Sequence, residues 1–204
     1  MGELLTKINV EKRQLMQGMM KNEKKMYSAL QEIKGYANPP VVLVRVLVSL
    51  FVILRVEGFE AHLGEDLKGF PDSPSPKLWK FTQGNIQLSQ RHPNNLLRLL
   101  SQATKAQVME DMKVDALQLY IDAAHHIMEP VERDAVHRAS SIAVRLLDWI
   151  NIGIKQANIE MELFRQTDDI FTESTTTMKQ VAVKAGVTTY LQKEISSDDS
   201  KKSL

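Results

Sequence analysis

Apolar residues recur at helical spacing near both ends of the chain, while the segment between them follows a different pattern. Residues 3 to 37 place apolar side chains in steps that are mostly three, four or seven, which is typical of a long helix with one apolar stripe. A second such pattern runs from about residue 132 to 180. We therefore predict two long helices, each with a seam that polar residues interrupt. The interruptions fall at Lys12, Asn22, Gln156 and Gln166.

The sequence Asn38-Pro39-Pro40 ends the first of these patterns. A proline disfavours helical backbone in the residue before it, so Asn38 should end the helix. Pro40 suits the first turn of the next helix, where its missing N–H costs nothing. The run Val41 to Leu54 that follows is apolar nearly all round. Its β-branched residues would suit a strand, but its length favours the central helix of a small bundle.

Glycine and proline are frequent between residues 57 and 77, which indicates a loop or flap with one short turn at about residues 60–67. The pattern beyond this segment predicts an all-α fold, with a small helical bundle at the tip of an antiparallel two-stranded coiled coil. Further helices are predicted at about residues 78–89, 94–103, 105–125 and from 131 onward. The predicted organisation is a first strand at 1–38, a globule at 39–149, a second strand at 150–180 and a polar tail at 181–204 that is disordered at its end.

Composition and charge narrow the classes of function. The 204 residues suit one domain, with or without an extension. With 26 basic and 25 acidic residues, the net charge of +1 gives no overall attraction to nucleic acid or to a membrane, and we expect neither as a partner. The chain has no cysteine, which excludes a disulfide framework and a thiol nucleophile. The longest apolar run is shorter than the roughly 20 residues of a membrane span.

No known catalytic arrangement is visible in the sequence. There is no glycine-rich phosphate loop ending in Lys-Ser/Thr and no Gly-x-Ser-x-Gly elbow. His125, Glu129 and Glu132 would share one helix face, but the HExxH arrangement is missing, and we expect an ordinary solvated face there rather than a metal site. We therefore predict that this chain is not an enzyme and carries no cofactor.

Basic residues are spaced so that several could gather on one side of the predicted bundle. Four of them lie at helical spacing in the last helix: Arg133, His137, Arg138 and Arg145. Residues of the middle helices could add to this set: Lys77, Lys80, Arg91, Arg98 and Lys105. The alternative is a scattered and solvated set, because basic and acidic residues nearly balance within the globule.

The order and spacing of these features resemble the stalk and microtubule-binding domain of dynein heavy chains. The resemblance covers about residues 25 to 165. The segments that carry it are Ala37-Asn38-Pro39-Pro40-Val41-Val42, the pair Trp79-Lys80, and Val136-His137-Arg138-Ala139-Ser140 with Ala143 and Trp149. The stretch from Val56 to Leu78 is longer than in cytoplasmic members and is similar to the extra flap of some axonemal dyneins.

The resemblance implies a mechanism and a partner. In that family the tip docks on tubulin, near the junction between subunits, through its first, third and last helices. Sliding of one coiled-coil strand past the other sets the affinity and reports to an ATPase ring elsewhere in the motor. The expected partners are therefore the microtubule and the parent motor or other dynein subunits, and the expected location is the microtubule cytoskeleton of the cytoplasm or the ciliary axoneme.

The resemblance also implies roles for particular residues. Arg138 corresponds to the tubulin-facing arginine of the last helix, and Asp134 to an acid that tempers binding. The basic position of the first bundle helix falls on Val44, so Arg45, one residue later, is a displaced candidate. The other predicted microtubule contacts are Arg133, His137, Arg145, Lys80, Arg91 and Arg98. The predicted register or hinge positions are Asn38, Pro39, Pro40 and Trp149.

One alternative from another class stays open at this point. The chain could be a helical coiled-coil adaptor that binds a partner helix and ignores tubulin. Binding to the acidic surface of tubulin would fall steeply with salt, whereas docking of a hydrophobic helix would change little. Salt dependence therefore separates the two predictions.

Overall fold

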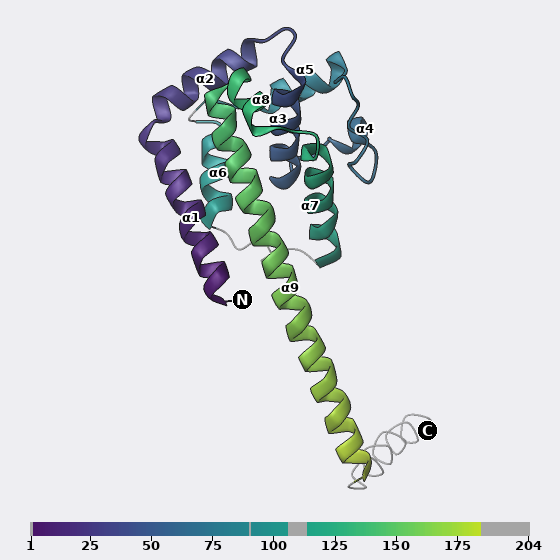
Figure 1. The fold of residues 1–204 in the computed structure, drawn as a ribbon. Helices are drawn as coiled ribbons and strands as arrows, with labels where there is room; N and C mark the ends of the chain where they lie inside the picture. The colour runs from purple at the N-terminus through teal and green to yellow at the C-terminus, as the bar shows by residue number, and fades with distance from the viewer. Residues whose placement is uncertain (1, 90, 106–113, 185–204) are drawn as a thin grey trace, which may run out of the picture. The chain divides into compact units, whose positions relative to one another are not determined.

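The computed structural model describes residues 2–89, 91–105 and 114–184, and all regular structure in these ranges is helical (Figure 1). The predicted all-α class is thereby confirmed for the described part of the chain. Contacts divide the chain into two compact units, Met1–Met161 and Glu162–Leu204. The helices are α1 Gly2–Lys21, α2 Glu23–Gly35, α3 Val41–Ile53, α4 Glu60–Leu63, α5 Pro76–Asn85, α6 Leu96–Lys105, α7 Val114–Met128, α8 Arg133–Ala139 and α9 Ser141–Lys184.

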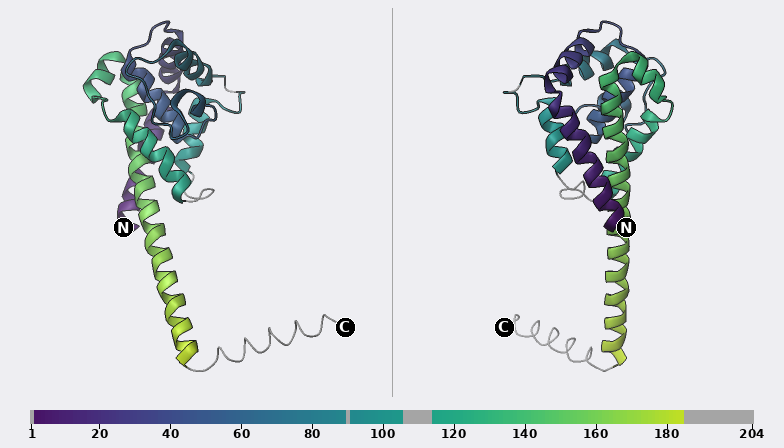
Figure 2. Two further views of the ribbon diagram at one scale, coloured as in Figure 1. Left: turned by 90° about the vertical axis from the view of Figure 1, so that its right-hand side faces the viewer. Right: turned by 60° about the vertical axis from the view of Figure 1, so that its left-hand side comes forward.

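Helix α3 is the centre of the first unit. Nine of its thirteen residues are buried, and it packs against α5, α7 and α8 (Figure 2). Leu43, Leu47 and Leu50 are each at most 1% exposed. Burying one such side chain contributes about 1.5–3 kcal/mol, so the apolar run is a major source of the unit's stability. The prediction of a central helix here, rather than a strand, is correct.

The first predicted helix is divided into two. α1 ends at Lys21 and α2 begins at Glu23, because Asn22 leaves the helical backbone with φ −111° and ψ 27°. The side-chain Nδ2 of Asn22 donates to the carbonyl of Gly18 at 3.0 Å. Asparagine competes with the backbone for such bonds and so favours helix ends over helix interiors. The expectation of one helix over residues 3–37 was wrong on this point.

The last predicted helix is also divided. Ser140 is extended, with φ −165° and ψ 123°, and separates α8 from α9. Its Oγ accepts the N–H of Ala143 at 3.3 Å, which makes it the N-cap of α9. The expectation of an unbroken helix from Glu132 was wrong, since the serine provides a start signal inside the apolar pattern.

The glycine- and proline-rich segment is packed into the core. Phe59, Leu63 and Leu67 are only 1–2% exposed. The ring of Phe59 lies 6.0 Å from that of Phe51 in α3 and 4.9 Å from that of Phe81 in α5, measured between centroids. The segment therefore forms one side of the core, and its predicted short turn is α4.

Helix α1 lies along α6 and antiparallel to the first part of α9 (Figure 2). Lys12 of α1 contacts Gln156, while Gly18, further along α1, lies near Arg145, earlier in α9. Among the described residues, no helix is both long and apolar enough to cross a membrane.

Candidate functional site

Helix α8 carries three of the eight predicted contact residues and the predicted affinity-tuning acid. The chain enters it from the extended Glu132, and Val136, fully buried, is its anchor in the core against α3. The remaining face is exposed and carries the predicted set Arg133, Asp134, His137 and Arg138. The structure thus brings four of the predicted residues together on one short helix.

Arg133 is engaged within the protein. Its Nε and Nη2 donate to Oδ1 and Oδ2 of Asp148 in α9, at 3.2 Å and 3.0 Å. These hydrogen bonds and the charge of Asp148 raise the pKa of Arg133. These two parallel hydrogen bonds hold α8 against α9, the helix that begins after the extended residue Ser140. Arg133 therefore holds α8 in position and is also an exposed cation.

Arg138 is placed differently. It is exposed in the last turn of α8 and makes no salt bridge or side-chain hydrogen bond with any residue that the structure describes. Asp134 precedes it by four residues, which places the two on the same face of the helix. His137 is exposed beside it. Arg138 therefore has its charge directed to solvent and available to a partner.

Arg45 of α3 points into the protein. Its Nη1 donates to the carbonyl of Ile127 in α7 at 3.0 Å, and its guanidinium lies 4.3 Å from the centre of the Phe70 ring. Burial lowers the pKa of Arg45, and the carboxylate of Asp72 opposes this effect. Val44, the alternative position, is fully buried. Arg45 thus joins α3, α7 and the 57–77 segment and is half-buried.

The other predicted cations lie on separate elements. Arg145 of α9 is half-buried, with its Nη1 3.5 Å from the position of a Cβ added to Gly18 of α1. Lys80 is exposed on α5, as is Arg91 in the loop before α6. The side chain of Lys105 lies outside the described residues. The structure therefore does not assemble all the predicted contacts into one surface.

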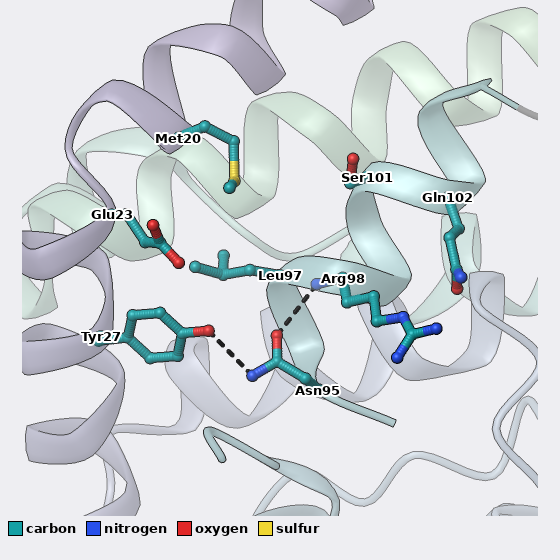
Figure 3. Close-up of a pocket in the computed structure, with 8 residues that line it drawn as sticks. All are labelled: Met20, Glu23, Tyr27, Asn95, Leu97, Arg98, Ser101 and Gln102. Atoms are coloured by element: carbon teal, nitrogen blue, oxygen red, sulfur yellow. Dashed lines mark hydrogen bonds between the residues drawn. The ribbon is translucent and has the colours of Figure 1, made fainter. Parts of the chain in front are cut away.

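Arg98 borders an open groove of about 370 Å³ between α6 and the junction of α1 with α2 (Figure 3). Asn95, 3% exposed, shapes this groove and caps α6, because its Oδ1 accepts the N–H of Arg98 at 3.1 Å. Its Nδ2 donates to the hydroxyl of Tyr27 at 2.9 Å. The lining residues are Met20, Glu23, Tyr27, Asn95, Leu97, Arg98, Ser101 and Gln102.

Side chains of α5 stabilise the Asn38-Pro39-Pro40 segment, which connects α2 to α3. Pro40 is the N-cap of α3, with φ −54° and ψ 138°. The indole Nε1 of Trp79 donates to the carbonyl of Tyr36 at 2.9 Å, and Gln83 donates to the carbonyl of Lys34. These bonds satisfy carbonyls at the end of α2, which have no partner within the helix. The tryptophan of the Trp79-Lys80 pair is thus a structural support for the joint.

The most unusual polar group is Lys12, which is 2% exposed. Its Nζ donates to Oε1 of Gln156 at 2.8 Å and to the carbonyl of Ala103 at 3.2 Å, and lies 5.0 Å from the centre of the Trp149 ring. Burial lowers the pKa of Lys12 from 10.5 to about 8, with the charge of Glu160 acting in the opposite direction. Sequence patterning placed Lys12 and Gln156 on two seams, but only the structure pairs them.

The histidine-rich end of α7 does not form a metal cluster with neighbouring groups. His126 lies 3.8 Å from Glu129, and both side chains are more than half exposed. Across the described residues, no three His, Cys, Asp or Glu side chains are placed to hold a metal ion together.

Comparison of the chain with models of protein families, with curated proteins and with solved structures found no match. The functional argument therefore depends on the residues and on the geometry described above.

Proposed function

We propose that the chain is the microtubule-binding tip, with part of the stalk, of a dynein-like motor, and that α8 is its principal contact with tubulin. The observation that carries this proposal is Arg138, which is exposed, has no ionic partner among the described residues, and sits on a helix held in place by Val136 and by the Arg133–Asp148 ion pair. The resemblance of the Val136–Ser140 segment to the last tip helix of that family supports the same assignment.

The chemistry of this surface suits an acidic protein partner. A guanidinium that is fixed on a helix can donate two parallel hydrogen bonds to a carboxylate, which is stronger and more directional than a lysine contact. His137 adds donor capacity next to it, and Asp134 on the same face weakens the attraction and allows release. Arg133 contributes less to a partner, because its guanidinium is already hydrogen-bonded to Asp148.

Arg45 has a supporting role in this proposal. Its donors face Ile127 and its planar face covers Phe70, so a partner would have to compete for a group that is already engaged. We therefore assign Arg45 to holding α3 and α7 beneath α8. Lys80, Arg91, Arg98 and Arg145 would provide long-range attraction from separate elements, with smaller individual effects than Arg138.

In this proposal the stalk comprises α1 and α2, within residues 1–38, and the part of α9 within residues 150–180. The antiparallel course of α1 along α9 is the arrangement that a two-stranded stalk requires, and the Asn38-Pro39-Pro40 joint leads from it into α3. In this proposal the catalytic ATPase belongs to another part of a motor, and this chain carries no catalysis.

Co-sedimentation with taxol-stabilised microtubules, at low and at physiological salt, tests the proposal. The matched variants are Arg138→Ala and Arg13→Ala, which removes an exposed arginine from α1. We expect saturable, salt-sensitive binding, weakened by about 1–3 kcal/mol in Arg138→Ala and unchanged in Arg13→Ala. If a folded Arg138→Ala protein binds as tightly as the parent chain, α8 is not the contact.

The groove in Figure 3 favours the second candidate, an adaptor that accepts a partner helix. Met20 is 40% exposed at its edge, and Leu97 lies beneath it, so a helix with apolar residues at i, i+3 and i+4 could cover it. Absence of microtubule binding from a folded chain, together with salt-insensitive binding of an amphipathic helix that Met20→Asp abolishes, would favour this function.

A further inference from the structure

Lys12 is a charged residue on the face of α1 that packs against α9, and its neighbours on this face are apolar. Its neighbours on the same face of α1, Ile8 and Met16, are buried, and so is Ile152 in α9. An ammonium group in such surroundings is costly unless it is hydrogen-bonded. A methionine would fill similar space without that cost, so the lysine calls for an explanation in terms of what its bonds connect.

The bonds of Lys12 connect three helices that are distant in sequence. The Nζ from α1 reaches a side chain of α9, Gln156, and a backbone carbonyl of α6, Ala103. The position of Gln156 is fixed in turn, because its Nε2 donates to Oε1 of Glu160 at 2.7 Å. Trp149 supplies an aromatic surface at 5.0 Å. Among the described groups, Glu160 is the charged residue whose field acts on Lys12.

We propose that Lys12 fixes the axial position of α1 relative to both α6 and α9. We call its bonds to these two helices the Lys12 tie. With the tie formed, α1 cannot move along α9 without breaking the bond to the Ala103 carbonyl and releasing α6. The proposal concerns the protein alone and does not depend on which partner it binds.

The residues along α9 determine the direction in which α1 can move when the present bonds of Lys12 break. Positions four residues from Gln156 lie on the same face of the helix, one turn or about 6 Å away. In one direction Lys12 would meet Ile152, which is apolar and leaves the ammonium without a partner. In the other direction it would meet the carboxylate of Glu160. Displacement of α1 toward Glu160 is therefore the accessible alternative.

The same tie controls the groove shown in Figure 3. One wall of the groove is the α1–α2 junction, with Met20 and Glu23, and the other is α6, with Leu97 and Arg98. Because Lys12 holds α1 to α6, its release changes the offset between the two walls. The groove is thus linked to the axial position of α1.

The absence of cysteine makes a direct distance measurement practical. Spin labels are placed on exposed residues by Gln14→Cys with Gln102→Cys, across α1 and α6, and by Gln14→Cys with Asn158→Cys, across α1 and α9. Double electron–electron resonance then gives both distance distributions for the parent chain, for Lys12→Met, and for Lys7→Met, a matched change at an exposed lysine of α1. Helical content by circular dichroism verifies that each variant is folded.

We expect narrow distributions in the parent chain and in Lys7→Met, and a broadened or shifted α1–α6 distribution in Lys12→Met. Gln156→Leu, which breaks the tie from the other side and retains the lysine, should shift the α1–α9 distance to shorter values as Lys12 moves toward Glu160. Adding Glu160→Gln should remove that shift. Unchanged distributions in folded Gln156→Leu, or in folded Lys12→Met, would overturn the proposal, because α1 would then be positioned by apolar packing alone.

Discussion

The buried lysine predicts an unusual dependence of stability on pH. Lys12 has a pKa of about 8 in the folded protein against 10.5 when exposed. Between these values the unfolded chain binds more protons than the folded chain, so the free energy of unfolding rises with pH. A lysine that is stabilised by a salt bridge has the opposite effect, because its contribution to the free energy of unfolding falls as pH rises. Below about pH 8 the penalty for burying the charge is fully present.

The magnitude follows from the shift of 10.5 to about 8. Each unit corresponds to about 1.4 kcal/mol, so burying the charged amine rather than the neutral amine costs on the order of 3 kcal/mol at neutral pH. Between pH 7 and pH 10 the contribution of Lys12 to stability should rise by about 2.5 kcal/mol. Lys12→Met removes the titrating group while retaining most of the side-chain volume, and it should remove this rise.

Urea unfolding followed by circular dichroism, at pH 7, 8, 9 and 10, measures the effect. Other lysines and tyrosines titrate in both proteins, so the difference between the parent chain and Lys12→Met isolates Lys12. The parent chain should gain stability relative to the variant as pH increases. If the difference is constant from pH 7 to pH 10, burial does not lower the pKa of the Lys12 amine and the reasoning is refuted. Lys7→Met provides the control, because that side chain is exposed.

Three further changes test other parts of the structure. Leu63→Ala should destabilise the chain by about 2–5 kcal/mol in urea unfolding, because Leu63 is 2% exposed, whereas a free flap would show almost no change. Ser140→Ala should cost about 1 kcal/mol by removing the N-cap of α9, and Ser28→Ala on an exposed face of α2 should cost much less. Trp79→Phe removes the hydrogen bond to the Tyr36 carbonyl and should cost about 1–3 kcal/mol of stability. Amide hydrogen exchange should also accelerate at the end of α2. Uniform acceleration over the whole unit would contradict the assigned role.

The all-helical class could be predicted because it follows from periodicity, which is local. The apolar run Val41–Leu54 was assigned to a buried central helix from its length and composition, and α3 has that position. The caps were harder to predict. Asn95 lies ahead of an obvious apolar run, whereas Asn22 and Ser140 lie inside continuous patterns, where a polar residue is expected to be tolerated. Their effect depends on side-chain bonds to Gly18 and Ala143 that periodicity does not report.

The partners of charged residues could not be predicted, since they depend on three-dimensional contacts. Arg45 and Arg138 look equivalent in the sequence, yet one is stacked on Phe70 and the other is exposed without an ionic partner among the described residues. Lys12 and Gln156 are 144 residues apart, and no local signal indicates that they are bonded. A useful signal was nevertheless present, because both residues interrupt apolar stripes, and a polar residue in such a position needs a partner if it is buried.

The joint at Ser140 has a consequence for how the surface of α8 could diversify. A single extended residue separates the seven residues of α8 from the forty-four of α9, and the burial of Val136 together with the Arg133–Asp148 ion pair fixes the direction in which the basic face is aimed. Substitutions on the exposed face, at positions such as His137 and Arg138, could therefore suit a different target without altering the core beneath it. Related chains that share this core could therefore differ in the surface they recognise while conserving almost every buried residue.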